Sequence, residues 1–210
     1  MAGRILVAAG TNGAGKSSIV QRFVEAQGGA YFNPDQETRK LVSKGVAADE
    51  ANGMAWKINY DMLRAAIDDD RDHAFETTLG GNSIAYEMMR TLATERRLTI
   101  LFVGLTSVEL HMQRVAERVA RGGHDIPEDK IRARYTRSRE NLLSFIGTQA
   151  QIRVWDNSEQ SAEGRPKPKL MFSIADRQLD LPQDYDPARV PEWVKPLLAR
   201  AFKFSTIAGV

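Results

Sequence analysis

A run of eight residues near the start of the chain has the composition and spacing of a phosphate-binding loop. Gly10 to Ser17 read GTNGAGKS, which satisfies every position of the pattern G-x-x-x-x-G-K-[ST]. Glycines permit a tight backbone path in which successive N–H groups face a phosphate, and the following helix adds the positive end of its dipole. In such loops the lysine bridges β- and γ-phosphate oxygens, and the serine hydroxyl ligates Mg²⁺. We therefore predict a P-loop that binds ATP and Mg²⁺, with Lys16 as a catalytic residue.

The neighbouring segments agree with this prediction. The apolar run Arg4 to Ala9 indicates a buried strand before the loop, and Lys16 to Ala26 has helical spacing after it. A strand, a loop and a helix in this order are the context that the motif requires. The nucleotide contacts are expected from the loop and the residue after it, namely Gly10, Thr11, Asn12, Gly13, Ala14, Gly15, Lys16, Ser17 and Ser18.

A P-loop alone does not select a reaction, because switches, motors and kinases all contain one. The base-reading motif N-K-x-D of GTPases is absent from the sequence, and so is the apolar strand ending in Asp-Glu that remodelling ATPases carry. Two features are typical of kinases instead: an acid directly after the expected second strand, and a long segment rich in arginine. These features favour transfer of the γ-phosphate to a hydroxyl group of a small molecule.

Two carboxylates follow expected strands. Asp35 comes after the short run Ala30 to Asn33, where a carboxylate can take the proton of an attacking hydroxyl and orient it toward the γ-phosphate. The alternative is that Asp35 caps the helix that follows. Glu76 lies near the end of the expected strand His73 to Thr77, where it can hold Mg²⁺ or grip the acceptor, unless it is an ordinary strand-end carboxylate. We predict Asp35 as the catalytic base and Glu76 as a residue of both the metal and substrate sites.

Seven arginines lie on either side of the pair Gly122-Gly123. They are Arg114, Arg118, Arg121, Arg132, Arg134, Arg137 and Arg139. Arginines on a mobile flap, here residues 114–139, can close over ATP and neutralise the transferring phosphate, with the glycine pair as a hinge. Most arginines on helix surfaces are solvated or in weak ion pairs, so we expect two or three of them in the site. Binding of RNA or DNA is the alternative, but Tyr135 is the only aromatic residue interleaved with the arginines, and we expect no nucleic-acid partner.

The alternation of apolar runs and helical patterns predicts an α/β fold. Core strands are expected at Arg4 to Ala9, Ala30 to Asn33, His73 to Thr77, Leu98 to Leu105 and Gln151 to Trp155. Repeated strand, helix and strand units form a parallel sheet with helices on both faces, the doubly wound arrangement. We therefore predict a P-loop NTPase fold with a five-stranded, mostly parallel sheet and an arginine-rich helical flap. Ligands are expected at the carboxyl ends of the strands.

Composition limits the possible functions further. A chain of 210 residues, 42% of them hydrophobic, fits one domain, with a core over about 4–156 and a hairpin and helix over about 159–204. The 29 basic and 27 acidic side chains nearly cancel, so no overall field holds the protein on nucleic acid or on an anionic membrane. The absence of cysteine excludes disulfides and thiol catalysis. The first residues are too short for a signal sequence or a membrane span, so we expect a cytoplasmic protein with no membrane partner.

Taken together and in this order, the motifs resemble those of the zeta-toxin-like P-loop kinases, whose studied toxin members phosphorylate the sugar of UDP-N-acetylglucosamine. The resemblance covers roughly Arg4 to Trp155. It rests on GTNGAGKS from Gly10, FNPD from Phe32, FETTL from Phe75, ERVARGGHDIP from Glu117 and IRARYTRSRENL from Ile131.

The resemblance implies a role for each matching residue. Lys16 and Ser17 would hold ATP and Mg²⁺, Asp35 would be the base, and Glu76 and Thr78 would face the substrate. Two flap arginines would serve the phosphates. Arg121 and Arg134 are the best matches and are assigned to catalysis, followed by Arg118 for the nucleotide and Arg137 for the acceptor.

The resemblance also implies an acceptor and a partner, namely a nucleotide sugar and an antitoxin protein. The toxins carry a helical region before the first strand, whereas the loop here begins at Gly10, and the segment from Glu159 has no clear counterpart in them. Two other functions therefore remain open. One is a kinase for another sugar or nucleotide alcohol, and the other is an interaction protein that binds ATP without transferring its phosphate.

Overall fold

A computed structural model describes residues 3–25, 31–94 and 96–207 of the chain, apart from the side chains of Ser18, Gln21, Arg22 and Glu25. One seven-stranded sheet carries the fold, with strand order β2-β1-β3-β4-β5-β6-β7. The strands are β1 (Arg4–Ala9), β2 (His73–Thr77), β3 (Arg97–Gly104), β4 (Gln151–Asp156), β5 (Lys169–Ala175), β6 (Gln178–Asp180) and β7 (Thr206–Ile207). Strands β1 to β4 pair in parallel, β5 and β6 add antiparallel, and β7 runs parallel to β6.

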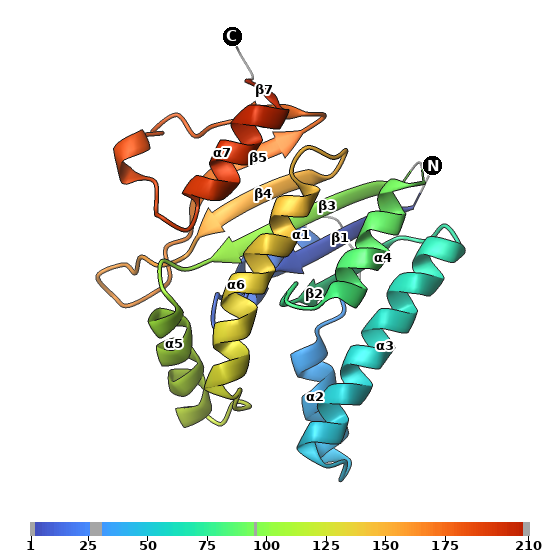
Figure 1. Cartoon of the computed structure of the whole chain (residues 1–210). Coiled ribbons are helices and arrows are strands. Elements are labelled where there is room, and N and C mark those ends of the chain that lie inside the picture. Colours follow the sequence, from blue (N-terminus) through green and yellow to red (C-terminus); the bar gives the residue numbers. More distant parts are fainter. Residues whose placement is uncertain (1–2, 26–30, 95, 208–210) are drawn as a thin grey trace.

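Seven α-helices connect or follow these strands (Figure 1) among the described residues. They are α1 (Lys16–Glu25), α2 (Pro34–Ser43), α3 (Ala48–Asp68), α4 (Asn82–Leu92), α5 (Val108–Ala120), α6 (Glu128–Phe145) and α7 (Lys195–Phe204). Ser107 caps α5 as its residue type predicts, because its side-chain oxygen accepts a hydrogen bond from the Leu110 N–H at 3.2 Å. The α/β fold with a mostly parallel sheet is therefore confirmed.

The number of strands differs from the predicted five. The run Ala30 to Asn33 does not form a strand in its described part, because only Phe32 pairs, through a single bridge to Phe75 of β2. The reason lies in the next two residues of the chain. Asn33 already caps α2, and Pro34 has no N–H to donate to a neighbouring strand. Ala30, and Ala26 at the end of the helical pattern that follows the P-loop, lie outside the described residues.

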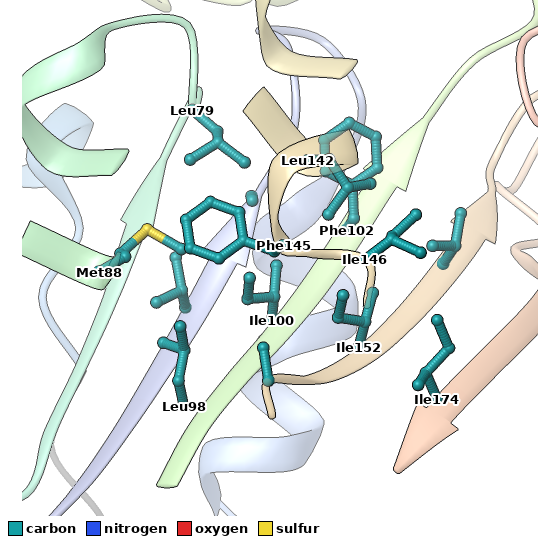
Figure 2. Close-up of a cluster of buried hydrophobic side chains, with 14 of the residues drawn as sticks. Leu79, Met88, Leu98, Ile100, Phe102, Leu142, Phe145, Ile146, Ile152 and Ile174 are labelled. Carbon is teal, nitrogen blue, oxygen red and sulfur yellow. The ribbon is translucent and has the colours of Figure 1, made fainter. Parts of the chain in front are cut away.

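Helices cover both faces of the sheet. On one face, α3, α4, α6 and α7 pack against the alternate apolar residues of β1, β3 and β4, and Figure 2 shows Met88, Ile100 and Phe145 within that layer. On the other face, Val20 and Val24 of α1 pack against Ala8 and Leu101. Burial on both faces explains why β1 and β3 read as continuous apolar runs.

The segment after β4 belongs to the same sheet and the same hydrophobic core. The hairpin β5–β6 lies within the segment where a hairpin was expected, and it turns at Asp176 and Arg177, both with positive φ. Trp193 and Leu197 from the C-terminal segment lie in the main core cluster. The C-terminal segment therefore adds three strands and a helix to the edge of the sheet beyond β4.

Candidate functional site

The P-loop connects β1 to α1 at the carboxyl ends of the parallel strands. Gly10, Gly13 and Gly15 have positive φ values of 138°, 80° and 83°, which L side chains rarely adopt. A Cβ on Gly10 would also lie 2.1 Å from the Val103 carbonyl oxygen of β3. The glycines are thus needed both for the turn of the loop and for its close packing against the neighbouring strand.

Side chains from three later segments brace the loop from outside. His111 of α5 bonds through Nδ1 to the Asn12 carbonyl oxygen at 2.7 Å, and Arg134 of α6 donates to Asn12 Oδ1 at 2.8 Å. Asn157, which follows β4, donates to the Ala14 carbonyl oxygen at 2.8 Å. Because burial lowers the pKa of His111 to about 4, the imidazole is neutral near pH 7 and donates its Nδ1 proton to the carbonyl.

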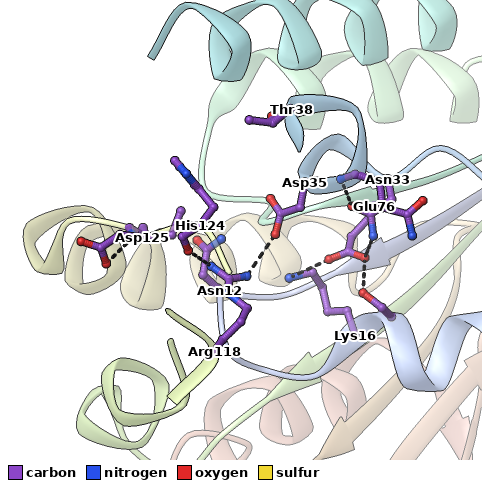
Figure 3. A network of polar contacts seen from close by, with 12 residues as sticks. Asn12, Lys16, Asn33, Asp35, Thr38, Glu76, Arg118, His124 and Asp125 are labelled. Atoms are coloured by element: carbon purple, nitrogen blue, oxygen red, sulfur yellow. Dashed lines mark hydrogen bonds and ion pairs between the residues drawn. The ribbon is translucent and has the colours of Figure 1, made fainter. Parts of the chain in front are cut away.

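Glu76 is the centre of the polar network beside the loop (Figure 3). Its Oε2 accepts hydrogen bonds from the Ser17 hydroxyl at 2.9 Å, the Tyr31 hydroxyl at 2.5 Å and the Asn33 amide at 3.1 Å. Its Oε1 lies 3.4 Å from Lys16 Nζ, and both of these side chains are almost completely buried. Lys16 Nζ also donates to the Gly10 carbonyl oxygen at 2.7 Å. The second strand of the sheet therefore places a carboxylate directly against the lysine and serine of the P-loop.

Tyr31 stays a donor to this carboxylate. Burial raises the pKa of its phenol strongly, and the negative charge of Glu76 raises it further. Phe32, its neighbour, donates its N–H to the Ala74 carbonyl oxygen and accepts from the Glu76 N–H, which ties this segment to β2. The short segment after the gap in the described residues thus fixes the orientation of the Glu76 side chain.

Asp35 lies in the first turn of α2 and does not cap it. The cap is Asn33, whose Oδ1 accepts from the Gln36 N–H at 3.2 Å. The carboxylate of Asp35 instead accepts from Arg118 Nη1 at 3.1 Å, while Nη2 of Arg118 donates to the His124 carbonyl oxygen (Figure 3). The capping alternative for Asp35 is therefore wrong, because its carboxylate is paired with Arg118 at the edge of a cavity.

A cavity of about 410 Å³ opens between the P-loop, α2, α3 and the connection from α5 to α6. Six of the predicted site residues converge on this one space, namely Asn12, Lys16, Asp35, Glu76, Thr78 and Arg134. Ser17 and Arg118 are connected to this cavity by hydrogen bonds to residues that line it, Ser17 to Glu76 and Arg118 to Asp35. A larger cavity of about 610 Å³, beside β2 and α3, contains none of the predicted site residues.

Two of the predicted arginines are not brought to this cavity. The side chain of Arg121 is 80% exposed and lies 3.9 Å from Glu117, a geometry that leaves it in solvent. Arg137 is exposed on α6. The structure thus favours Arg118 over Arg121 at the site, because Arg118 lies in the last turn of α5 and faces Asp35, whereas Arg121 is the capping residue that follows the helix. The side chain of Ser18 lies outside the described part of the structure.

A second cavity of about 350 Å³ lies on the far side of Arg118. Arg39, Arg114, Arg118 and Arg121 line it, together with backbone around Gly122 and the loop from Gln160 to Pro166. Gly123 is required beside it, since a Cβ there would lie 2.8 Å from the Arg118 carbonyl oxygen. Four arginines and Glu117 therefore line a cavity beside Arg118, whereas Arg139 is not part of it and packs on Tyr135 instead.

Several residues of the site carried no recognisable signal in the sequence. Asn52 of α3 bonds to His124 Nε2 at 3.0 Å and accepts from Thr38 at 3.2 Å, which links α2, α3 and the flap. Asn59 and Trp56, also from α3, line the same cavity. Single amides and aromatics on an amphipathic helix look like ordinary surface or core residues until the fold places them.

The oxygen ligands at the loop fit a magnesium ion bound together with phosphate. Ser17 and Glu76 present a hydroxyl and a carboxylate 2.9 Å apart, and Mg²⁺ prefers such hard oxygen ligands. Within the described ranges no group of three or more His, Cys, Asp or Glu side chains could hold a metal. This agrees with the usual protein site for Mg²⁺, which contains one or two carboxylates and is completed by substrate phosphates and water.

None of the helices in the described part of the chain combines the length and the apolar character needed to cross a membrane.

Structural comparison places the fold among known P-loop proteins. The complex of AvrRxo1-ORF1 with AvrRxo1-ORF2 crystallised with ATP contains a chain that superposes with a TM-score of 0.62 at 14% identity, covering 98% of this chain and 77% of that one. A protein of the PezAT chromosomal toxin-antitoxin system of Streptococcus pneumoniae superposes with a TM-score of 0.51 at 11% identity, covering 97% and 87%. At such identities the likeness shows the fold alone.

Sequence comparison identifies the family. An uncharacterized protein of Haemophilus influenzae is 28% identical over 134 residues, which cover 60% of this chain and 88% of that protein. Residues 5–142 match the family described as AAA domain, from β1 to the last turn of α6. Because this match spans more than half of the chain and includes the P-loop, the protein belongs to the AAA domain family, with a P-loop kinase-like fold.

Proposed function

We propose that the protein is an ATP- and Mg²⁺-dependent kinase that transfers the γ-phosphate to a hydroxyl group of a small molecule. The observation that carries the proposal is the convergence of Lys16, Glu76 and Asp35 on one cavity at the mouth of a P-loop. A nucleotide-binding loop alone would fit a switch or a motor. A carboxylate facing an open cavity beside it supplies the base that phosphoryl transfer to an alcohol needs.

Each residue then has a definable task. The loop N–H groups and the start of α1 bind the β-phosphate, and Lys16 Nζ turns from the Gly10 carbonyl to the phosphate oxygens. Bound Mg²⁺ would neutralise charge on the phosphate oxygens, with Ser17 and Glu76 as the protein groups that hold it. Arg134, already fixed to Asn12, faces the same space and stabilises negative charge on the transferring group.

Asp35 takes the proton of the acceptor hydroxyl. As that proton moves to the carboxylate, the acceptor oxygen bonds to the γ-phosphorus and the bond from phosphorus to the ADP oxygen breaks. Arg118 lies between the Asp35 carboxylate and the second, arginine-rich cavity. A nucleotide that extends over the loop into that cavity offers phosphate oxygens to Arg118, which would release Asp35 for the acceptor.

The family resemblance makes UDP-N-acetylglucosamine the first acceptor to test, with other sugars and nucleotide alcohols as alternatives. The assay incubates purified protein with γ-labelled ATP, Mg²⁺ and these acceptors, and follows the label into products, with Lys16→Ala as the control. We expect label in at least one acceptor with the wild-type chain and none with the variant. Tight ATP binding with label in no acceptor would instead support a nucleotide-dependent interaction protein.

An antitoxin-like partner is a separate hypothesis, suggested by the likeness to a protein of the PezAT toxin-antitoxin system. If the activity is toxic, cells that express the wild-type chain grow poorly, whereas cells that express Lys16→Ala grow normally. Equal growth of the two strains at equal expression would argue against a toxin.

A further inference from the structure

The wall of the 410 Å³ cavity opposite the P-loop differs from the P-loop side in the polar and charged residues that line it. What this wall implies about the acceptor rests on the kinase function proposed above. Helices α2 and α3 form this wall. Besides Asp35, they contribute Thr38, Asp49, Asn52, Trp56 and Asn59 to the lining. No lysine or arginine of either helix lines the cavity, although both helices are fully described, and Arg39 of α2 lines the second cavity instead.

The charged residues in the rest of the cavity lining do not supply the positive charge that this wall lacks. Lys16, Arg134, Asp35 and Glu76 form the catalytic set beside the P-loop. Outside that set the lining contains Asp49 and Asp125 but one cation, Lys130, which is exposed on α6. Sites that bind phosphate or carboxylate ligands normally supply arginine or lysine, because a desolvated anion needs a partner. The acceptor wall therefore disfavours a ligand with an anionic group.

Asn59 gives the wall a specific requirement. Its side chain is 2% exposed, it lines the cavity, and its Oδ1 has no hydrogen-bond partner among the described residues. Ala55 and Leu63, one turn before and after it on α3, are apolar core residues. A buried amide oxygen without a partner is destabilising, so a ligand that donates a hydrogen bond to it gains affinity.

Trp56 adds an apolar surface to the same wall. It is 46% exposed and stacks on Tyr60 with ring centroids 5.4 Å apart and an interplanar angle of 13°, which leaves its other surface toward solvent and the cavity. A rigid ring beside amide groups suits a ligand that has both C–H surfaces and hydroxyl groups.

We propose that α2 and α3 bind an uncharged, hydroxyl-rich acceptor, such as a free sugar or sugar alcohol, and that Asn59 at the base of the wall accepts a hydrogen bond from one of its hydroxyl groups. Asn59 is then a specificity-determining residue of the acceptor site. A nucleotide sugar, with its diphosphate, is a poorer ligand for this wall than the corresponding free sugar.

The test compares uncharged acceptors with counterparts that carry an anionic group on one of their hydroxyl positions: N-acetylglucosamine with N-acetylglucosamine 1-phosphate and with UDP-N-acetylglucosamine, glucose with glucose 1-phosphate and with glucose 6-phosphate, and ribose with ribose 5-phosphate. Transfer of label from γ-labelled ATP gives kcat/KM for each. We expect the uncharged member of the preferred pair to exceed its anionic counterpart by about tenfold or more. An anionic member that is equal or better would overturn the proposal.

Two variants test Asn59 itself. Asn59→Leu removes a buried polar group without changing the size of the side chain much, so its thermal midpoint is expected to stay equal or rise. Its KM for the uncharged acceptor should nevertheless rise about tenfold while its KM for ATP stays unchanged. Asn59→Asp keeps a side-chain oxygen that can accept a hydrogen bond, so its KM for the uncharged substrate should stay closer to that of the wild type than the KM of Asn59→Leu. An unchanged acceptor KM in Asn59→Leu would show that Asn59 has only a structural role.

A failure of the proposed kinase function can be told apart from a failure of this inference. If no acceptor of the panel receives label, tryptophan fluorescence titrations with the same pairs report binding through Trp56, with Trp56→Phe to identify its signal. Tighter binding of the uncharged members, lost in Asn59→Leu, would support the acceptor wall without transfer. Preference for the anionic members, or binding of neither, would contradict it.

Discussion

Replacing Glu76 by glutamine tests the network beside the P-loop, because the substitution keeps the shape of the side chain and removes its charge. Three donors share Oε2 of Glu76, and Lys16 faces Oε1 at 3.4 Å. In Glu76→Gln the amide oxygen can still accept hydrogen bonds from Ser17, Tyr31 and Asn33. The amide nitrogen, however, then faces the Lys16 ammonium, and two hydrogen-bond donors that face each other cannot bond.

The magnitude follows from these contacts. Three hydrogen bonds change from charge-assisted to neutral, a loss of about 1 kcal/mol each, and the nearly buried ion pair with Lys16 disappears. Relief of the buried charge offsets part of this cost. We expect Glu76→Gln to lower the free energy of unfolding by about 2–4 kcal/mol. Glu76→Ala should cost more, since it leaves the buried Asn33 amide without its partner.

The assays are urea unfolding and ATP titration with Mg²⁺ or with EDTA. In the wild-type chain Mg²⁺ should strengthen ATP binding, whereas in Glu76→Gln this enhancement should fall about tenfold or more. Without metal the variant should bind ATP at least as well as the wild type, since Lys16 no longer faces a competing carboxylate. Glu192→Gln, at a carboxylate that is 86% exposed and away from the cavities of the site, is the matched control and should change stability by less than about 0.5 kcal/mol. Unchanged stability together with an unchanged effect of Mg²⁺ in Glu76→Gln would refute this account of the network.

Two further predictions concern the loop and its support. Gly10→Ala places a Cβ 2.1 Å from a backbone oxygen at a residue with positive φ, so it should lower the free energy of unfolding by about 2–4 kcal/mol. Gly53→Ala in α3 has open space around the new Cβ, so in the same chemical denaturation assay it should raise the free energy of unfolding by up to about 1 kcal/mol. Equal effects of the two glycine substitutions would contradict the described path of the loop. Burial lowers the pKa of His111 to about 4, so below about pH 6.5 the unfolded chain binds the extra proton and stability is lost as pH falls toward 4. Between pH 7 and pH 5 the loss of stability due to His111 alone is about 2 kcal/mol. Unfolding measured at the two pH values should show that His111→Gln removes this loss. A pH dependence of His111→Gln equal to that of the wild type would refute the lowered pKa of His111.

Local patterns in the sequence predicted the parts of the site that lie close to the P-loop. The motif at Gly10 to Ser17 and the apolar runs of β1 and β3 encode their own conformations, since glycine placement and continuous hydrophobicity are local signals. The position of Glu76 followed from the rule that the carboxyl ends of parallel strands meet at one edge of the sheet, whereas Asp35 lines the same cavity although the described part of the run before it forms no strand. The structure places both on the same cavity as Lys16, which lies beside Glu76.

The parts that the sequence did not predict depend on tertiary contacts. Arg118 and Arg121 lie three residues apart at the end of α5, and only the packing and the end point of that helix decide which of them faces Asp35. The run before Asn33 has the composition of a strand, but Pro34 and the start of α2 leave it one bridge. His111 braces the loop from 99 residues away in the chain, a relation that no local pattern reveals.

The measurement that tests the central claim most directly is single-turnover phosphoryl transfer by Asp35→Asn, with an acceptor that the wild-type chain phosphorylates. The variant keeps a side chain of the same size that can still accept from Arg118, so ATP binding should stay within about threefold of wild type. Transfer should fall by roughly 100-fold or more, because an amide cannot take the hydroxyl proton. Transfer at the wild-type rate by a variant that binds ATP normally would show that Asp35 is not the base, and would contradict the catalytic arrangement proposed here.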